Sequence, residues 1–226
     1  MERPVRTVVG AAVVVVAGTV VHRLRYARSP VVPRRGPAVL VVNHLATTET
    51  LAVARMVVTH RRFPHFLIMD RAFAWPVVGR LLRIARQIPV QRGSAAAAAA
   101  VEAAAAELGR GHLVVLYPEG RITRDPDLWP GPGRSGAARL ALRFPAAPLI
   151  PVGQWGARPG ARHLWHRHTV KLVVGAPIDR TRWAGRTDTA AARELTDVIM
   201  DEIRALVGRL RGVTPPDPGT TVDREG

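Results

Sequence analysis

The sequence predicts an α/β fold in which a mixed, mostly parallel β-sheet is flanked by helices. Short apolar runs alternate along the chain with longer segments of helical periodicity, and this alternation is typical of a sheet covered on both faces. The chain has 226 residues, of which 47% are hydrophobic and 22% are charged. This length allows one domain with a substantial core. The composition excludes a chain that is disordered as a whole and excludes a polytopic membrane protein.

The N-terminal segment is apolar and lies between cationic residues. Residues 7–21 carry no charge, and arginines stand on both sides of them (Arg3, Arg6, Arg23, Arg25 and Arg28). The segment is shorter than the roughly 20 residues of a spanning helix, and no small-residue cleavage site of a signal peptide follows it. Basic flanks suit attachment to an anionic leaflet. We therefore expect an N-terminal apolar membrane-attachment helix within residues 1–30, with a buried terminal helix as the alternative.

The remaining chain is predicted to form one domain, residues 31–212, followed by a flexible tail, residues 213–226. Apolar runs predict strands at Ala38–Val42, 66–69, 87–91, 112–117, 148–152 and 170–174. Helical periodicity predicts helices at 48–59, from Pro76 onward, at 94–108, at 136–144 and at Thr189–Arg211. Ser94 is a suitable N-cap for the alanine-rich helix, and Gly109 and Gly111 end it. In the helix after Pro76, one apolar face is expected from Val77, Val78, Leu81, Leu82 and Ala85.

The charge balance predicts an affinity for polyanions. Lysine and arginine total 33 against 17 acidic residues, a formal net charge of +16, and there is no cysteine. The cations would attract nucleic acid, anionic lipid or phosphorylated substrates. The absence of cysteine excludes disulfides, thiolate zinc sites and cysteine nucleophiles. His163, His166 and His168 have no carboxylate or thiolate nearby in the sequence, so we expect a solvated loop there and no metal site.

The first candidate site is the run NHLATTE, residues 43–49, at the carboxyl end of a predicted strand. Ligands of open α/β sheets bind at such ends. His44 and Glu49 can meet only if His44 lies in the turn and Glu49 in the first helical turn, because on a regular helix they would be about 140° apart. A carboxylate at that place would hold the imidazole tautomer and create a general base for a hydroxyl. The alternative is a capping histidine beside a glutamate favoured by the helix dipole.

The second candidate site is the run YPEGRITR, residues 117–124, which also follows an apolar strand. Proline and glycine favour a turn, from which Arg121 and Arg124 could project toward the same cleft as His44. Guanidinium groups bind phosphate with paired hydrogen bonds. The alternative is an ordinary arginine-bearing surface loop.

Together these motifs resemble the glycerolipid acyltransferase family, in particular the 1-acylglycerol-3-phosphate acyltransferases. Three further stretches match in the family's order: IPVQR at 88–92, GRSGAA at 133–138 and LIPV at 149–152. The resemblance extends well over residues 37–155 and loosely over the C-terminal third. Two positions depart from the family's pattern, which has aspartate where Glu49 stands and threonine where Arg121 stands.

The resemblance implies a role for each matching residue. His44 would remove the proton from the acceptor hydroxyl, with Glu49 orienting it and Asn43 supporting the turn. A pocket for the acceptor's phosphate would be formed by Arg92, Glu119 and Gly120. Arg121 and Arg124 are added to this pocket on the ground of their charge. The hydroxyl would attack an acyl thioester directly, so acyl-CoA or acyl carrier protein serves as co-substrate and no further cofactor is expected.

The resulting prediction is an acyltransferase of phospholipid biosynthesis, associated with an anionic membrane at the cytoplasmic face of the plasma membrane. Its partners would be a lysophospholipid, an acyl thioester and, in one variant, acyl carrier protein. One alternative is a serine hydrolase with Ser135 as nucleophile, although the surrounding residues form a poor nucleophile elbow. A second is a non-enzymatic basic protein that binds nucleic acid or anionic membrane. No specific nucleic acid is expected, because aromatic content is 5% and no DNA-binding motif is present.

Overall fold

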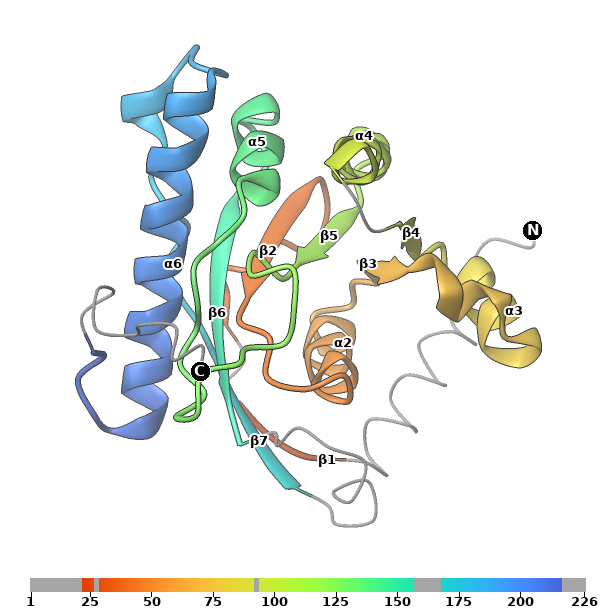
Figure 1. Ribbon diagram of the computed structural model, residues 1–226, viewed down its shortest axis with the longest axis horizontal. Helices are drawn as coiled ribbons and strands as arrows, with labels where there is room; N and C mark the ends of the chain where they lie inside the picture. The colour runs from red at the N-terminus through yellow and green to blue at the C-terminus, as the bar shows by residue number, and fades with distance from the viewer. Residues whose placement is uncertain (1–21, 27–28, 92–93, 157–167, 217–226) are drawn as a thin grey trace.

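A computed structural model of the chain describes residues 22–26, 29–91, 94–156 and 168–216 (Figure 1). The strands are β1 (His22–Tyr26), β2 (Ala38–Val42), β3 (Pro64–Met69), β4 (Ile88–Val90), β5 (Leu113–Leu116), β6 (Leu149–Trp155) and β7 (His168–Val174). The helices are α2 (Glu49–Thr59), α3 (Pro76–Ile84), α4 (Ser94–Gly109), α5 (Gly136–Arg143) and α6 (Thr189–Arg211), with 3-10 turns η1 (Asp70–Ala74) and η3 (Thr181–Trp183). Each strand and helix expected within residues 31–212 is therefore present.

The described strands form one sheet in the order β1-β7-β6-β2-β5-β3-β4. The five strands from β6 to β4 run parallel to one another, β7 is antiparallel to β6, and β1 is parallel to β7. The prediction of a mixed, mostly parallel sheet is confirmed. Its consequence for function is that the carboxyl ends of β2 and β5, which are paired neighbours, lie side by side at one edge.

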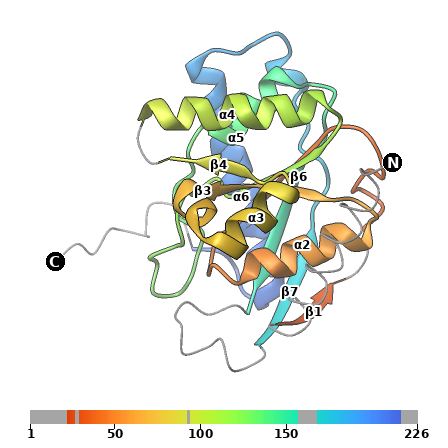
Figure 2. The same ribbon diagram turned by 90° about the vertical axis from the view of Figure 1, so that its right-hand side faces the viewer.

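Helices cover both faces of the sheet because its central strands are apolar on both sides. On β2, Val39 and Val41 belong to a core shared with α4, α5 and α6, whereas Leu40 and Val42 belong to a core shared with α2. Figures 1 and 2 show α4 and α2 on opposite sides of the strands. Helix α6 approaches β6 closely, since a Cβ placed on Gly153 would lie 2.6 Å from the Cβ of Leu206.

The sheet extends into the segment that the sequence assigned to membrane attachment. β1 lies within residues 1–30, where its arginines were interpreted only as basic flanks, and it pairs in parallel with β7 from His22 to Tyr26. The apolar residues 7–21 lie outside the described residues, as do residues 217–226 of the predicted tail. No helix in the described part of the chain is long and apolar enough to cross a membrane.

Candidate active site

The two candidate loops contact each other directly. The main-chain N–H of His44, just beyond β2, donates a hydrogen bond of 2.8 Å to Oε1 of Glu119, just beyond β5. In the opposite direction, the N–H of Thr123 donates to the carbonyl oxygen of His44 at 2.8 Å. The parallel pairing of β2 with β5 thus brings the predicted base and the predicted arginine-bearing turn to one place.

Glu119 connects three segments of main chain. Its side chain is buried, and its second oxygen, Oε2, accepts the N–H of Gly131 at 3.1 Å. Burial raises the pKa of Glu119 to about 7, and the hydrogen bonds from the His44 and Gly131 N–H groups oppose that rise. Since both oxygens accept main-chain hydrogen bonds, the geometry identifies Glu119 as a residue that positions the two loops.

His44 and Glu49 meet as the sequence required. Nδ1 of His44 lies 2.6 Å from Oε1 of Glu49, and Glu49 is the first residue of α2 and fully buried. Both carboxylate oxygens also accept the N–H of Leu45, at 2.8 and 2.9 Å. A carboxylate at Nδ1 selects the tautomer in which Nδ1 carries the proton and Nε2 keeps its lone pair. The His44 side chain is 19% exposed, so a small part of the ring reaches solvent.

The Glu49 carboxylate has two partners, the imidazole of His44 and the main chain of the turn before α2. Burial raises the pKa of Glu49, while the hydrogen bonds from His44 and Leu45 lower it. The N-cap residue Thr48 makes no side-chain capping bond, and Glu49 reaches back to the turn in its place. A glutamate at this position therefore both closes the turn before α2 and orients the imidazole.

Tyr117 holds the other side of the imidazole, a role that sequence reasoning missed. Its ring stacks on His44 with centroids 4.2 Å apart and planes inclined by 19°. Its hydroxyl donates to Oγ1 of Thr50 at 3.2 Å. Burial raises the pKa of Tyr117 well above its usual range, and the nearby Glu49 carboxylate adds to that rise. The available signal was its place directly before Pro118 at the end of an apolar strand.

Asn43 ties the end of β2 to β6. Its Oδ1 accepts the N–H of Gln154 at 2.9 Å, and its Nδ2 donates to the Gln154 carbonyl at 3.1 Å. The Gln154 side chain in turn donates to the Asn43 carbonyl, and both residues are fully buried. Asn43 therefore supports the turn that carries His44, with Gln154 as a partner that sequence reasoning missed.

Glu119 was predicted to bind the phosphate, but its buried carboxylate accepts main-chain hydrogen bonds from His44 and Gly131 instead. The other predicted phosphate-binding residues divide into three groups. Gly120 has φ +64°, and a Cβ there would lie 2.9 Å from Cδ of Arg134, so glycine suits both the backbone and the close approach. Arg121 and Arg124 are exposed on either side of Thr123, whose N–H contacts His44. Arg92 lies outside the described residues. Arg134, which the sequence offered only as part of a motif, crosses the same turn.

Other reactive groups of the described residues are already hydrogen-bonded. Oγ of Ser135 accepts a bond of 3.3 Å from Nε of Arg139, and a guanidinium cannot act as the base of a hydrolase. His65, Glu107 and His112 have ligand atoms within 4.8 Å of one another. However, Nδ1 of His65 donates to the Arg86 carbonyl and Nδ1 of His112 to Glu107. This cluster lies at the amino ends of β3 and β5, away from the candidate active site.

The fold thus places a histidine, oriented by a buried carboxylate, at the carboxyl ends of the parallel strands of an α/β sheet. Residues 23–155 match the family model described as Acyltransferase, which covers more than half of the chain, and the chain therefore belongs to the Acyltransferase family. This confirms the resemblance stated from the motifs and the prediction of an O-acyltransferase.

Among solved structures, the chain resembles the crystal structure of the 1-acyl-sn-glycerophosphate (LPA) acyltransferase PlsC from Thermotoga maritima. The TM-score is 0.71 at 20% sequence identity, and the match covers 93% of this chain and 83% of that one. This likeness supports the fold. No curated protein matches the chain.

Replacing Glu119 by Gln is expected to lower the free energy of unfolding by about 1–3 kcal/mol. The glutamine amide has only one acceptor oxygen, so its NH₂ group must face one of the two main-chain N–H groups. That N–H group then has no acceptor inside the protein. Urea denaturation of the parent and the variant measures this loss. Glu102→Gln is the matched control, because that carboxylate is largely exposed.

The parent and Glu119→Gln should also differ in the pH dependence of their free energy of unfolding. The folded pKa of Glu119, about 7, lies above the value of 4.5 expected when the chain is unfolded. Its contribution to stability is therefore fully present below pH 4.5 and lost as pH rises through about 7. Glu119→Gln should remove this component of the slope, and parallel pH profiles of the parent and the variant would contradict it.

Proposed function

We propose that the protein transfers a fatty acyl group from acyl-CoA or acyl carrier protein to the free hydroxyl of a lysophospholipid such as 1-acylglycerol-3-phosphate, in phospholipid biosynthesis. The observation that carries the proposal is the 2.6 Å contact between His44 Nδ1 and Glu49, beside the turn at residues 117–124. The resemblance to the 1-acyl-sn-glycerophosphate (LPA) acyltransferase of Thermotoga maritima supports the choice of acceptor.

In this proposal the proton leaves the acceptor hydroxyl for Nε2 of His44. Glu49 holds the proton on Nδ1 and stabilises the imidazolium that forms, while stacking on Tyr117 restricts rotation of the ring. The hydroxyl oxygen attacks the thioester carbonyl, and the tetrahedral intermediate collapses with loss of the thiolate, which takes the proton back from His44. No acyl-enzyme forms, in agreement with a chain that has no cysteine.

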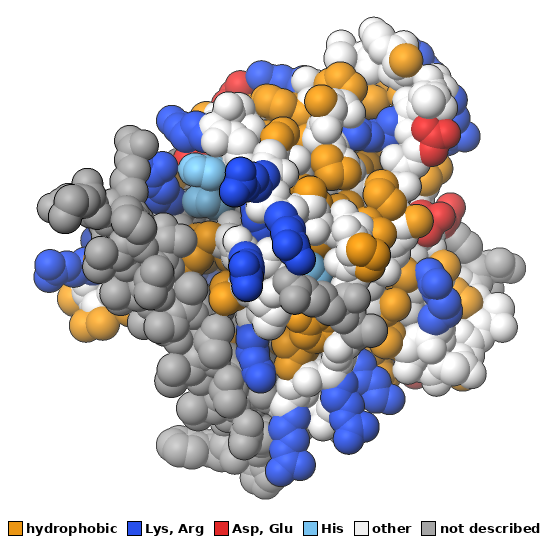
Figure 3. All heavy atoms as spheres, turned by 180° about the vertical axis from the view of Figure 1, so that it is seen from behind, with side chains coloured by type: hydrophobic (Ala, Val, Ile, Leu, Met, Phe, Trp, Pro, Cys, Tyr) orange, Lys and Arg blue, Asp and Glu red, His pale blue; other side chains and the backbone are white. Residues whose placement is uncertain are grey.

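The acceptor's phosphate would be bound by cations around the Gly120 turn. Arg121, Arg124 and Arg134 are exposed in this part of the chain, and Arg92 is proposed to join them from its position after β4. Guanidinium groups can bind a phosphate with paired hydrogen bonds. On the face in Figure 3, Lys and Arg side chains clearly outnumber acidic ones, which favours anionic substrates and surfaces in general.

Replacing His44 by Ala should lower the rate of acyl transfer by about 10²–10⁴-fold through the loss of base catalysis, with a further loss from positioning. The assay incubates purified protein with labelled acyl-CoA and a panel of lysolipids and identifies the acylated product. Ser135→Ala is the control and should retain parent activity. Full activity of His44→Ala would overturn the assignment, and inactivity of Ser135→Ala alone would favour the hydrolase.

Replacing Glu49 by Gln should reduce kcat more than replacing it by Asp, by on the order of 10²-fold or more relative to the parent. Gln can still accept one hydrogen bond but has no charge with which to stabilise the imidazolium. Asp keeps the charge at the family's usual length. Thermal unfolding of both variants separates catalysis from stability. Small and equal effects would reduce Glu49 to a charge at the start of α2.

We also propose membrane association through residues 7–21, at the cytoplasmic face of the plasma membrane. An apolar segment between arginines suits an anionic leaflet. Deleting residues 7–21 should shift the protein from the membrane fraction toward the soluble fraction, as measured by fractionation and immunoblotting. An unchanged distribution would contradict this attachment.

A further inference from the structure

Helix α3 exposes an apolar surface that the core does not use. Among the described residues, the large hydrophobic side chains most exposed near this helix are Trp75 at 64%, Val77 at 71%, Val78 at 39% and Leu81 at 41%. We call these four residues the α3 face. The periodicity that predicted one apolar side of the helix is real, but that side faces outward. Exposed contiguous apolar patches mark interaction sites on soluble proteins.

The attachment of α3 to the protein explains why this face stays uncovered. Of the residues of this helix, only Gly79 is buried. A Cβ on Gly79 would lie 2.0 Å from the carbonyl oxygen of Phe73, so the helix rests on η1 through a close main-chain contact. Nη1 of Arg83 adds a hydrogen bond of 2.9 Å to the same carbonyl. Because glycine makes the contact, the large apolar side chains are not needed to hold α3 in place.

Several exposed cations are close in sequence to the α3 face. Arg71, Arg80, Arg83 and Arg86 are all exposed, and the helix itself contains no acidic residue. The nearby carboxylate of Asp70 accepts the N–H of Arg71 at 2.7 Å. An apolar stripe bearing a tryptophan, with arginines beside it, is the pattern of a helix that lies in the interface of an anionic membrane.

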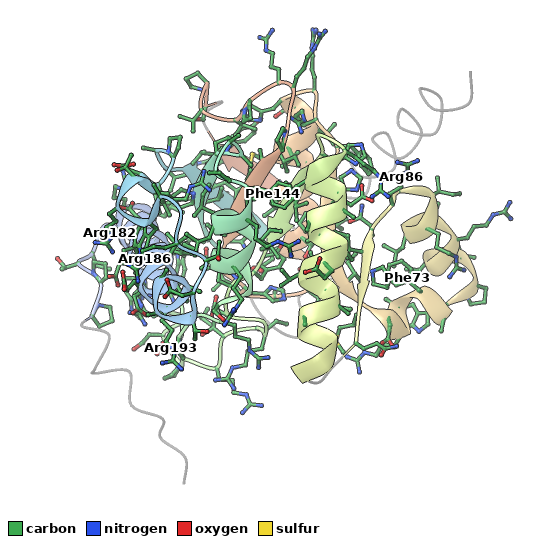
Figure 4. The ribbon with its side chains drawn as sticks, turned by 90° about the horizontal axis from the view of Figure 1, so that it is seen from above. Phe73, Arg86, Phe144, Arg182, Arg186 and Arg193 are labelled. Atoms are coloured by element: carbon green, nitrogen blue, oxygen red, sulfur yellow. The ribbon has the colours of Figure 1, made fainter. Side chains whose placement is uncertain are left out.

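η1 and α3 follow the carboxyl end of β3, which is the end of the parallel strands at which the candidate active site also lies. η1 begins at Asp70, immediately after the carboxyl end of β3, and β3 is the parallel neighbour of β5. The ring of Phe66 on β3 lies 6.3 Å from that of Tyr117. Figures 1 and 4 show the η1–α3 unit, with Phe73 labelled in Figure 4, at the end of the molecule opposite α6.

We propose that the α3 face docks on the surface of an anionic phospholipid bilayer, as a contact separate from residues 7–21. Trp75, Val77, Val78 and Leu81 enter the boundary between headgroups and acyl chains, and the arginines around them bind lipid phosphates. The part of the inference in which docking presents a lipid acceptor to His44 rests on the proposed function. The membrane contact itself does not require any particular reaction.

The direct test measures Trp75 in the intact protein. In vesicles of phosphatidylglycerol and acyl-brominated phosphatidylcholine, the bromine atoms quench the fluorescence only of tryptophan side chains that enter the bilayer. Quenching is expected for the parent protein and should largely disappear in Trp75→Phe. It should persist in Trp183→Phe, because Trp183 is buried. Equal quenching of the parent and Trp75→Phe, or no quenching of the parent, would overturn the proposal. Either result would be expected if residues 7–21 alone bind the bilayer or if they cover α3.

A second measurement uses matched surface variants. Val77→Ser combined with Leu81→Ser should weaken binding to phosphatidylglycerol-containing vesicles about tenfold or more, whereas Val213→Ser, at a site 51% exposed after α6, should not. Arg80→Glu should weaken binding more than Arg193→Glu, which lies on α6 (Figure 4). Unchanged affinity in the Val77 and Leu81 variant would also reject the α3 face.

Acyl transfer to a short-chain, water-soluble acylglycerol phosphate separates the two proposals. Activity in the parent without quenching of Trp75 would reject docking and leave the proposed function in place. Quenching of Trp75 without activity toward any lysolipid would keep the membrane surface and reject the proposed function. The docking variants should retain parent activity on the soluble acceptor, because none of the changed residues belongs to the site around His44.

Discussion

One carboxylate, that of Glu119, determines whether the candidate site exists as a unit. Parallel pairing brings the ends of β2 and β5 together, but strand pairing ends before the loops begin. Beyond it, the Glu119 oxygens accept N–H groups from the turn carrying His44 and from Gly131. Burying a charge is unfavourable unless hydrogen bonds compensate it, and here burial prevails, because the pKa of Glu119 rises to about 7. The organisation of the site therefore carries a cost in stability near neutral pH.

His44 is restrained by three groups from different parts of the chain, two at its ring and one at its main chain. Glu49 fixes the proton on Nδ1, Tyr117 stacks against the ring, and Thr123 bonds the main-chain carbonyl of His44. Pre-organisation of this kind reduces the entropy that must be lost when a hydroxyl and the base come together. The geometry of Glu49 also explains how glutamate can occupy the position at which the family has aspartate. The longer side chain is folded back onto the Leu45 N–H and so reaches the imidazole from the first residue of α2.

Local patterns predicted most of the elements and the central pair of the site. α6 has the predicted bounds because both of its ends are readable: Asp188 caps the Ala191 N–H, and Gly212 adopts a left-handed conformation. His44 and Glu49 were predicted as a pair because His44 could lie in the turn after a strand and Glu49 in the first helical turn, and because the motif resembles that of the acyltransferase family. β1 was missed since its basic residues show no strand pattern without β7 as a neighbour.

Contacts between residues distant in sequence were beyond prediction. Gln154 is 111 residues from Asn43, and nothing near either residue indicates the pairing. The stacking of Tyr117 on His44 likewise depends on the register between two strands. The sequence thus predicted which residues of the candidate site come together better than it predicted the contacts that hold them.

Helix α3 shows the limit of periodicity as evidence for burial. An apolar stripe establishes that one side of a helix avoids water, but it does not identify what covers that side. In α5 the stripe packs into the core with Leu140, whereas in α3 a glycine makes the contact and the stripe remains exposed. A lysophospholipid has its acyl chain in the bilayer and its hydroxyl near the headgroups. An enzyme that acts on such a molecule within the membrane must bring its base to that depth. A docking helix that follows a strand at the same end of the sheet as His44 would allow this without extracting the lipid.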